Sequence, residues 1–283
     1  MSIYANISTI LFLALFSCSG KGDEAVPYIS KPTPPVDKGW TFVTTAFWQD
    51  EFNYTGKPDT AKWGYDIGGS GWGNNELQYY TNNANNASVA DGNLTITLRK
   101  EDFGGRNYTS ARLATRNKFD FLYGRVEIKA KLPAGKGTWP ALWTLPTDFA
   151  YGNWPSSGEF DIMEHVGYDP DVIHVSAHTE KFNFKLNNGK TGIRKIDNVA
   201  TQYHVYRMDW TPYSIKGYVD DVLLLEYVND GSGPAEWPFD KRFHLLFNIA
   251  YGGDWGGAQG LDTNIFPASM NIDYVRYYKM IDK

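Results

Sequence analysis

The chain has 283 residues, which is enough for one large all-β domain or for two small domains. Its formal net charge of −5 disfavours nucleic acid as a partner, and its single cysteine, Cys18, excludes a disulfide from the folded part. Aromatic residues make up 16% of the chain, with 10 Trp and 19 Tyr. Their flat rings suit either a core or the apolar C–H faces of a sugar.

The amino-terminal end has the pattern of a signal peptide followed by a linker. Residues Ile7–Ser17 form an apolar run that is too short to span a membrane. The run ends in LFSCSG, which resembles the bacterial lipobox, where the cysteine is lipidated after cleavage. Residues 19–38 are rich in Gly, Pro, Lys and Asp, as flexible tethers are. We therefore expect a signal peptide over 1–18, a tether over 19–38 and one folded domain over 39–283, displayed as an outer-membrane or cell-surface lipoprotein through Cys18.

From residue 39 onward the sequence is typical of an antiparallel β-sandwich. Apolar and polar residues alternate in Asn93–Lys100 and in Gly124–Leu132, as they do in strands with one buried face. Tyr213–Tyr227 is predicted to be a hairpin that turns at Asp220–Asp221. We find no second linker, no repeat and no sustained helical period. Further strands are predicted at Phe243–Ala250 and Asn271–Lys279.

Aromatic residues gather in three segments. In an extended Trp139–Leu145 the side chains of Trp139, Ala141, Trp143 and Leu145 share one face. Two tryptophans at that spacing are either core residues or a platform for sugar rings. Two further segments are loops rich in glycine and amides, which suit hydroxyl recognition or are simply long surface loops: Gly68–Tyr80 and Tyr251–Gly260.

The segment Gly158–Gly167, GEFDIMEHVG, carries three carboxylates within six residues. In an extended strand Glu159 and Asp161 share one face, whereas strict alternation sends Glu164 to the opposite, apolar face. An unpaired carboxylate is costly to bury there. A β-bulge at Ile162–Met163 resets the alternation and returns Glu164 to the face of the other two acids. We therefore predict a bulged strand with a row of three acids.

Such a row has two interpretations. The simpler one is a solvated face or a calcium site, and the bare pattern favours it. In the other, like charges this close raise the proton affinity of at least one acid. One protonated acid beside one ionised carboxylate is the pair of groups that glycoside hydrolysis requires. The surrounding segments favour this second interpretation.

These segments together resemble glycoside hydrolase family 16, and within it the bacterial laminarinases, which are endo-β-1,3-glucanases. The resemblance covers the chain from about Trp40 onward, and the bulged form of the acidic motif is the laminarinase-like one. Phe160 stands where Ile is more usual. The matching segments are DEF at 50–52, NNELQYYT at 74–81, DGNLTI at 91–96, TSARLAT at 109–115, YGRVEIKAKLPAGKGTWPALWTLP at 123–146, GEFDIMEHVG at 158–167, AHT at 177–179, FNIAYGGDWGGAQG at 247–260 and IFPASMNIDYVRYY at 265–278.

The resemblance implies a β-jelly roll of two curved antiparallel sheets with a glycan cleft on the concave face. It also implies a retaining double displacement, in which Glu159 corresponds to the nucleophile and Glu164 to the general acid/base. Asp161 lies between them and is expected to hold Glu159 in place and tune the shared proton. Retaining carboxylates lie ~5–5.5 Å apart, which is about the spacing of neighbours on one strand face.

The resemblance further implies a set of substrate-binding residues. Trp139 and Trp143 match cleft residues that stack sugars or flank the nucleophile. Arg112 matches a cleft arginine, with a surface salt bridge as the alternative, and His178 matches a histidine near the acid/base, with a structural role as the alternative. Five residues fall in cleft-lining segments that bind hydroxyls: Asn75, Glu76, Asn248, Trp255 and Gln259.

Many members of this family also bind one structural calcium on the convex face, and its ligands match Glu51, the Gly92 carbonyl and Asp273. Oxygen ligands from distant segments suit a hard cation that pins both chain ends. The alternative is that these are three ordinary surface groups. We expect no cofactor for catalysis.

The sequence therefore predicts an endo-glucanase that cuts internal β-1,3 bonds of laminarin-type glucans. One alternative is a mixed-linkage β-1,3/1,4-glucanase of the same fold. Another is a non-catalytic glycan-binding lipoprotein, against which the presence of both glutamates argues. We expect a monomer whose partner is a β-glucan polysaccharide, with no nucleic acid, and with a membrane contacted only through the lipid anchor.

Overall fold

The computed structural model describes residues 33–282, so the predicted signal peptide, Cys18 and most of the tether lie outside the described residues. Residues 33–40 have no regular secondary structure. From Thr41 onward the regular secondary structure of the described chain is almost entirely β-strand, and its helical structure is the short 3-10 turn η1 (Phe184–Leu186). In residues 33–282 no helix is long and apolar enough to cross a membrane. The predicted all-β class is confirmed.

One sheet has ten strands, and the predicted alternation is present in it. In Gly124–Lys131 the residues Val126, Ile128 and Ala130 are fully buried, whereas the charged residues between them are partly exposed. One face of this strand therefore belongs to the core. The order is β17 (Val222–Val228), β16 (Ser214–Val219), β15 (His204–Trp210), β10 (Gly124–Lys131), β19 (Ala268–Tyr278), β6 (Asn93–Phe103), β7 (Arg106–Ser110) and β4 (Gln78–Tyr80), with β2 (Trp48–Asp50) beside β19 and β5 (Ala87–Ala90) beside β6.

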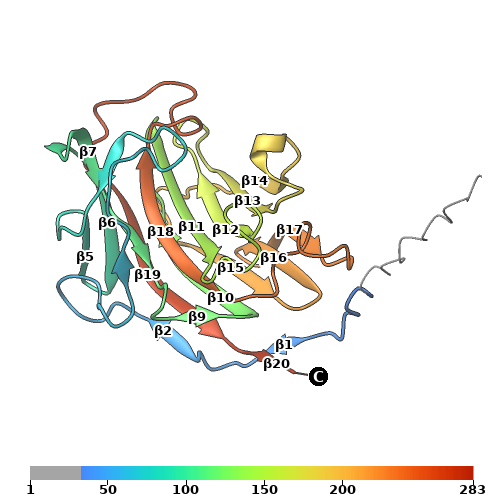
Figure 1. Ribbon diagram of the computed structural model, residues 1–283. Coiled ribbons are helices and arrows are strands. Elements are labelled where there is room, and N and C mark those ends of the chain that lie inside the picture. Colours follow the sequence, from blue (N-terminus) through green and yellow to red (C-terminus); the bar gives the residue numbers. More distant parts are fainter. Residues whose placement is uncertain (1–32, 283) are drawn as a thin grey trace, which may run out of the picture. The chain divides into compact units, whose positions relative to one another are not determined.

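The second sheet has eight strands and contains the acidic segment as β12. Figure 1 shows β18, β11, β12 and β13 as neighbouring curved strands of this sheet. The order is β14 (Lys190–Lys195), β13 (Val172–His178), β12 (Glu159–His165), β11 (Thr138–Pro146), β18 (Phe243–Tyr251), β8 (Arg112–Ala114) and β3 (Gly64–Tyr65), with β9 (Asp120–Phe121) beside β18. A small third sheet pairs β1 (Thr41–Phe42) with β20 (Met280–Ile281).

The predicted hairpin at residues 213–227 is confirmed as β16 and β17. It turns at Asp220 and Asp221, whose φ angles are 47° and 64°. Two successive residues with positive φ characterise the type I′ turn, which matches the twist of an antiparallel pair. Aspartate tolerates this conformation better than most residues, so two adjacent aspartates are enough to predict the turn.

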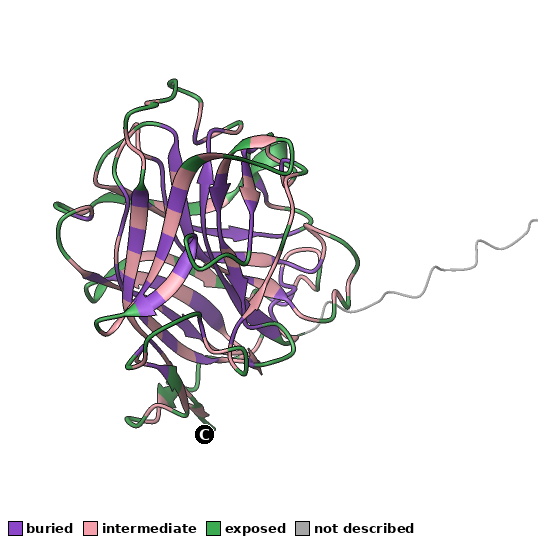
Figure 2. Ribbon diagram, turned by 90° about the vertical axis from the view of Figure 1, so that its left-hand side faces the viewer, coloured by how far each residue is buried: buried purple, intermediate pink, exposed green. Residues whose placement is uncertain are grey.

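The core lies between the two large sheets and anchors β12 from behind. Ile128 and Tyr206 of the ten-stranded sheet and Phe160 and Phe247 of the eight-stranded sheet belong to one fully buried cluster. Figure 2 shows the strands largely buried and the connecting loops largely exposed. Burial of a side chain such as Phe160 is worth about 1.5–3 kcal/mol. The apolar face of β12 therefore fixes the direction in which its acids point.

Candidate active site

The acidic strand β12 contains one residue more than its neighbours at the predicted position. Glu164 lies opposite Ala141 of β11, and Asp161 lies opposite Trp143, so three steps on β12 match two steps on β11. The register with β13 shows the same offset. The predicted bulge is confirmed. It turns Glu164 to the face of the other two acids, and all three side chains line one cavity.

Two glycines bound this strand for steric reasons. Gly158 has a φ of 86°, and a Cβ there would lie 2.7 Å from the side chain of Pro238. At Gly167 a Cβ would lie 1.9 Å from the carbonyl oxygen of Gly135. Neither position accepts a larger residue without displacement of its neighbours. Both ends of the acidic segment are therefore fixed by close packing, against side chains at Gly158 and against the Gly135 backbone at Gly167.

A cavity of about 360 Å³ opens on the outward face of the eight-stranded sheet. Part of its wall is the face of β11 that carries Trp139, Ala141, Trp143 and Leu145, which confirms that these side chains point the same way. The acids of β12 lie beside this wall. The remaining lining residues come from β18, β8 and loops: Asn248, Ala250, Arg112, Trp72, Gly73, Asn74, Glu76, Phe149, Trp154, Phe184 and Lys185.

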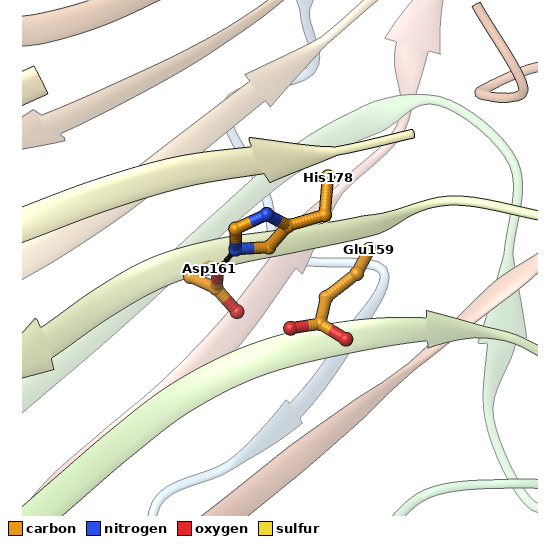
Figure 3. Close-up of side chains that lie close together, drawn as sticks. All are labelled: Glu159, Asp161 and His178. Carbon is orange, nitrogen blue, oxygen red and sulfur yellow. Dashed lines mark ion pairs between the residues drawn. The ribbon is translucent and has the colours of Figure 1, made fainter. Parts of the chain in front are cut away.

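The three acids have few but specific partners. The Trp139 indole Nε1 donates a hydrogen bond of 3.0 Å to Glu164 Oε1. His178 Nε2 lies 3.1 Å from Asp161 Oδ2, and the Glu159 carboxyl group lies beside that of Asp161 (Figure 3). Glu159, Asp161 and His178 offer ligand atoms within 4.8 Å of one another, a spacing that admits a metal ion. Retaining glycoside hydrolysis requires no cofactor, because carboxyl groups supply both nucleophile and proton.

Burial raises the proton affinity of all three acids, and repulsion by the Asp161 charge adds to it at Glu159 and Glu164. Burial raises the pKa of Glu164 to about 8, and the nearby Asp161 charge adds to the effect. Burial raises the pKa of Asp161 to about 7, although the hydrogen bond with Glu159 lowers it. Burial, followed by the Asp161 charge, holds the pKa of Glu159 well above its usual range. The acids therefore titrate as a coupled group that keeps at least one proton near neutral pH.

On the side of Trp143 that faces away from the acids, a chain of hydrogen bonds fixes the cavity wall. Trp143 Nε1 donates to Asn248 Oδ1 at 2.7 Å, and Asn248 Nδ2 donates to the Tyr80 hydroxyl at 3.1 Å. That hydroxyl donates to Glu76 Oε2 at 3.2 Å. Glu76 and Asn248 were predicted cleft residues, and both line the cavity. Their polar groups are preorganised, because each is held by a buried partner.

The predicted cleft arginine lies between two indoles. The Arg112 guanidinium carbon is 4.7 Å from the ring centroids of both Trp72 and Trp143. Its Nε also pairs with Asp66 at 3.0 Å. Arg112 therefore lines the cavity and forms a salt bridge at once, and its contact with substrate stays a prediction.

Four predicted substrate-binding residues do not line the cavity. His178 contacts Asp161, and the Asn75 amide donates to Asp254 at 2.8 Å. Trp255 packs edge-on against Trp139, with ring centroids 5.3 Å apart. Gln259 is exposed on the loop that follows Trp255. Substrate contact by these four residues stays a prediction.

Sequence reasoning did not single out several residues of the cavity wall. Trp72 and Asn74 lie in the glycine-rich loop that was expected to recognise hydroxyls, so a signal for them existed. Trp154 lies five residues before Glu159, but no spacing rule connects it to the acids. Phe149, Phe184 and Lys185 come from loops whose path only the tertiary structure fixes.

The three predicted calcium ligands lie together at a second pocket of about 310 Å³. Their oxygens, with Asn53, Asp91 and Asn93 nearby, have the chemistry of a hard-cation site. The carboxylates already have cationic partners, however. Glu51 accepts two hydrogen bonds from Arg276, at 2.7 and 2.8 Å, and Asp273 lies 2.7 Å from Lys129 Nζ. The oxygen donors suit Ca²⁺. The two carboxylates can bind it only after their ion pairs with Arg276 and Lys129 have broken.

Comparison with known proteins identifies the chain. The sequence model described as "Glycosyl hydrolases family 16" matches residues 74–276. The chain belongs to this family.

Relatives agree with this assignment over most of their length. A β-glucanase of Rhodothermus marinus is 50% identical over 243 residues, which cover 83% of this chain and 85% of that protein. The X-ray structure of the laminarinase from Rhodothermus marinus has a TM-score of 0.82 at 49% identity and covers 86% of this chain and 98% of its own. A non-specific endo-β-1,3(4)-glucanase, crystallised with a glucan oligosaccharide, has a TM-score of 0.80 at 40% identity, with coverage of 88% and 97%. The predicted family and jelly-roll fold are confirmed, and this family 16 chain is a glycoside hydrolase.

Proposed function

We propose that this family 16 enzyme is a retaining endo-glucanase that hydrolyses internal β-1,3 bonds of laminarin-type glucans. The observation that carries the proposal is the bulge in β12, which brings Glu159 and Glu164 to one face in one cavity. Similarity to the Rhodothermus marinus laminarinase supports the β-1,3 linkage. The aromatic wall of the cavity supports a sugar substrate, because pyranose rings offer apolar faces to indoles.

In the first step Glu159 attacks the anomeric carbon of the bound glucosyl unit. The bond from that carbon to the leaving oxygen breaks, and Glu164 transfers its proton to this oxygen. The raised pKa of Glu164, about 8, keeps the proton available at neutral pH. The first product leaves, and a covalent glycosyl-enzyme ester remains at Glu159.

In the second step the now ionised Glu164 removes a proton from water, which attacks the same carbon and releases Glu159. Trp139 stabilises ionised Glu164 through its indole N–H. Asp161 has the complementary task at Glu159. Because the two carboxyl groups lie side by side, Asp161 can hold the proton while Glu159 is the nucleophilic anion.

The mechanism is tested by the stereochemistry of the early products. Proton NMR of laminarin digests is expected to show β-anomers first, and initial α-anomers would contradict retention. Azide rescue separates the two glutamates on a β-glucoside with a good leaving group. Glu159→Ala is expected to yield the α-glucosyl azide and Glu164→Ala the β-azide, because azide enters from opposite faces. Unchanged turnover in Glu159→Gln would favour a non-catalytic glycan-binding protein.

A second candidate substrate is mixed-linkage β-1,3/1,4-glucan. The non-specific endo-β-1,3(4)-glucanase that covers 88% of this chain favours it. Initial rates on laminarin, barley β-glucan and agarose, measured with one enzyme preparation, decide between them. We expect laminarin to give the highest kcat/KM, and a higher value on barley glucan would reverse the assignment.

We further propose that the pocket of Glu51, Gly92 and Asp273 binds one structural calcium. Support comes from the oxygen-rich donor set that the fold assembles there. Binding requires Lys129 and Arg276 to release the two carboxylates. Titration calorimetry with Ca²⁺ tests this, with Asp273→Asn as the comparison, and no heat of binding would reject it.

We also propose that Cys18 is lipidated and that the folded domain acts as a monomer at the cell surface. The lipobox-like LFSC and the tether composition support anchoring. Labelling of cells with an alkyne fatty acid is expected to mark the native chain but not Cys18→Ala.

The proposed monomer is tested by light scattering of residues 39–283, which is expected to give the mass of one chain.

A further inference from the structure

Phe184 is an exposed aromatic side chain that lines the catalytic cavity. It is 54% exposed and belongs to η1, in the connection between β13 and β14. An aromatic ring at a cavity rim that is exposed to water gains apolar contact when a flat ligand covers it. Its neighbour Leu186, on the same turn, is 57% exposed and does not line the cavity.

Hydrogen bonds of two asparagine side chains, those of the buried Asn183 and the exposed Asn188, hold this turn in place. The Asn183 side chain, 2% exposed in the residue as a whole, accepts from Leu186 N at 3.2 Å and donates to Thr179 O at 3.0 Å. The Asn188 side chain accepts from Asn183 N at 3.1 Å and donates to Lys181 O at 2.9 Å. The backbone of the turn that carries Phe184 is therefore fixed before any ligand arrives, which lowers the entropy cost of binding.

The surroundings of Phe184 combine aromatic rings with a hydrogen-bond donor. The Trp154 ring lies 5.3 Å away and the His178 ring 5.7 Å away, both between centroids. Lys185 Nζ is 4.7 Å from the Trp154 centroid. A β-glucosyl unit needs this pairing, because it has apolar C–H faces and a rim of hydroxyls. Since His178 also contacts Asp161, the cluster adjoins the catalytic acids.

We propose that Phe184, with Trp154 and Lys185, forms a subsite for one neutral β-linked glucosyl unit of the bound chain. The subsite lies on the β13–β14 side of the acids, away from Trp72 and Arg112. Phe184 contributes its ring face and Lys185 an N–H donor to a hydroxyl. This inference rests on the proposed glucanase function, since it assigns the substrate of the same cleft.

The test compares Phe184→Ala with Leu186→Ala, each in a Glu159→Gln background that does not consume substrate. Titration calorimetry with laminari-oligosaccharides of two to seven units measures Kd. Phe184→Ala is expected to weaken binding about tenfold, and only for oligosaccharides long enough to reach η1 from the acids. Phe184→Tyr keeps a flat ring and is expected to restore affinity, and Leu186→Ala is expected to change nothing.

Three outcomes would overturn the subsite: unchanged Kd in Phe184→Ala, equal weakening in both alanine variants, or weakening that does not depend on oligosaccharide length. The parent enzyme is assayed on laminarin in parallel. If it binds the oligosaccharides without hydrolysing laminarin, the glucanase function fails while the Phe184 comparison still decides the subsite. If it neither binds nor hydrolyses them, both proposals fail.

Discussion

The protein assembles acids at two places, and their surroundings differ. At the second pocket Glu51 and Asp273 have side chains 29% and 38% exposed, and each is within 2.7 Å of an arginine or lysine nitrogen. In the cleft Asp161 is 3% exposed at its side chain, and the basic side chain beside it is a histidine, His178. Among residues 33–282 no lysine or arginine forms an ion pair with the three cleft acids.

The difference teaches what makes a carboxylate reactive. A cation beside an exposed acid stabilises the anion, so the group serves charge balance. Burial without a strong cation stabilises the protonated form, and the pKa of Glu164 accordingly rises to about 8. The same residue type favours its protonated form in one place and its anion, paired with a cation, in the other.

The strongest way to sharpen this comparison is to neutralise one acid at each place. Glu159→Gln is expected to lower kcat on laminarin by about 10⁴-fold or more, because no other group reaches the anomeric carbon. Glu51→Gln is expected to keep kcat within about twofold of the parent. Both rates come from a reducing-sugar assay with correctly folded variants confirmed by circular dichroism. Equal losses in the two variants would contradict the assignment of the cleft.

The next effect is expected from the histidine of the cleft. His178 lowers the pKa of Glu159 and of Glu164, so His178→Asn is expected to raise both. The falling limb of the kcat/KM–pH profile then moves upward from about pH 8, and the rising limb moves upward as well. Each limb is expected to move by roughly one pH unit, so kcat/KM on the acidic side falls by about tenfold. A profile that falls in height without moving would indicate a structural role for His178.

A raised pKa also changes stability. Glu164 has a pKa of about 8 in the fold against its ordinary value of 4.5, so the folded state binds more protons between these values. Stability therefore falls as pH rises from about 4.5 to 8. Glu164→Gln is expected to be more stable than the parent by about 1–3 kcal/mol at about pH 8.5 and nearly equal at about pH 4.5. Thermal melts at both pH values measure this.

The matched control is Glu226→Gln, which alters an exposed acid paired with Lys216 at 3.0 Å. Its melting temperature is expected to differ from the parent by the same small amount at both pH values. A gain for Glu164→Gln that does not depend on pH would contradict the proposed proton linkage.

The smallest effect is expected at the second pocket. Glu51→Gln breaks a two-pronged contact with Arg276 that joins segments 225 residues apart. Because both side chains are about one-third exposed, the loss is expected to be about 0.2–1 kcal/mol. Urea unfolding in low and high salt measures it. A loss of several kcal/mol would show that this pair is a main link between the chain ends.

Much of the fold was readable because strands carry a local signal. The alternation in β10 and the Asp220–Asp221 turn depend on adjacent residues, and both are present as predicted. The bulge in β12 was also predictable, because a charged residue out of phase with its strand is too costly to bury. The wall residues Phe149, Phe184 and Lys185 were not, since the path of a loop depends on distant packing.

The sequence by itself determined the family, the strand pattern and the acids Glu159, Asp161 and Glu164, because periodicity and the cost of burying charge act over a few residues. Only the tertiary structure decided which acids lose their solvent and which gain a cation. It also decided that Trp255 packs on Trp139 while Phe184 faces the cavity. The physical reason is that burial and charge pairing are set by segments far apart in the chain, which come together only in the packed sheets.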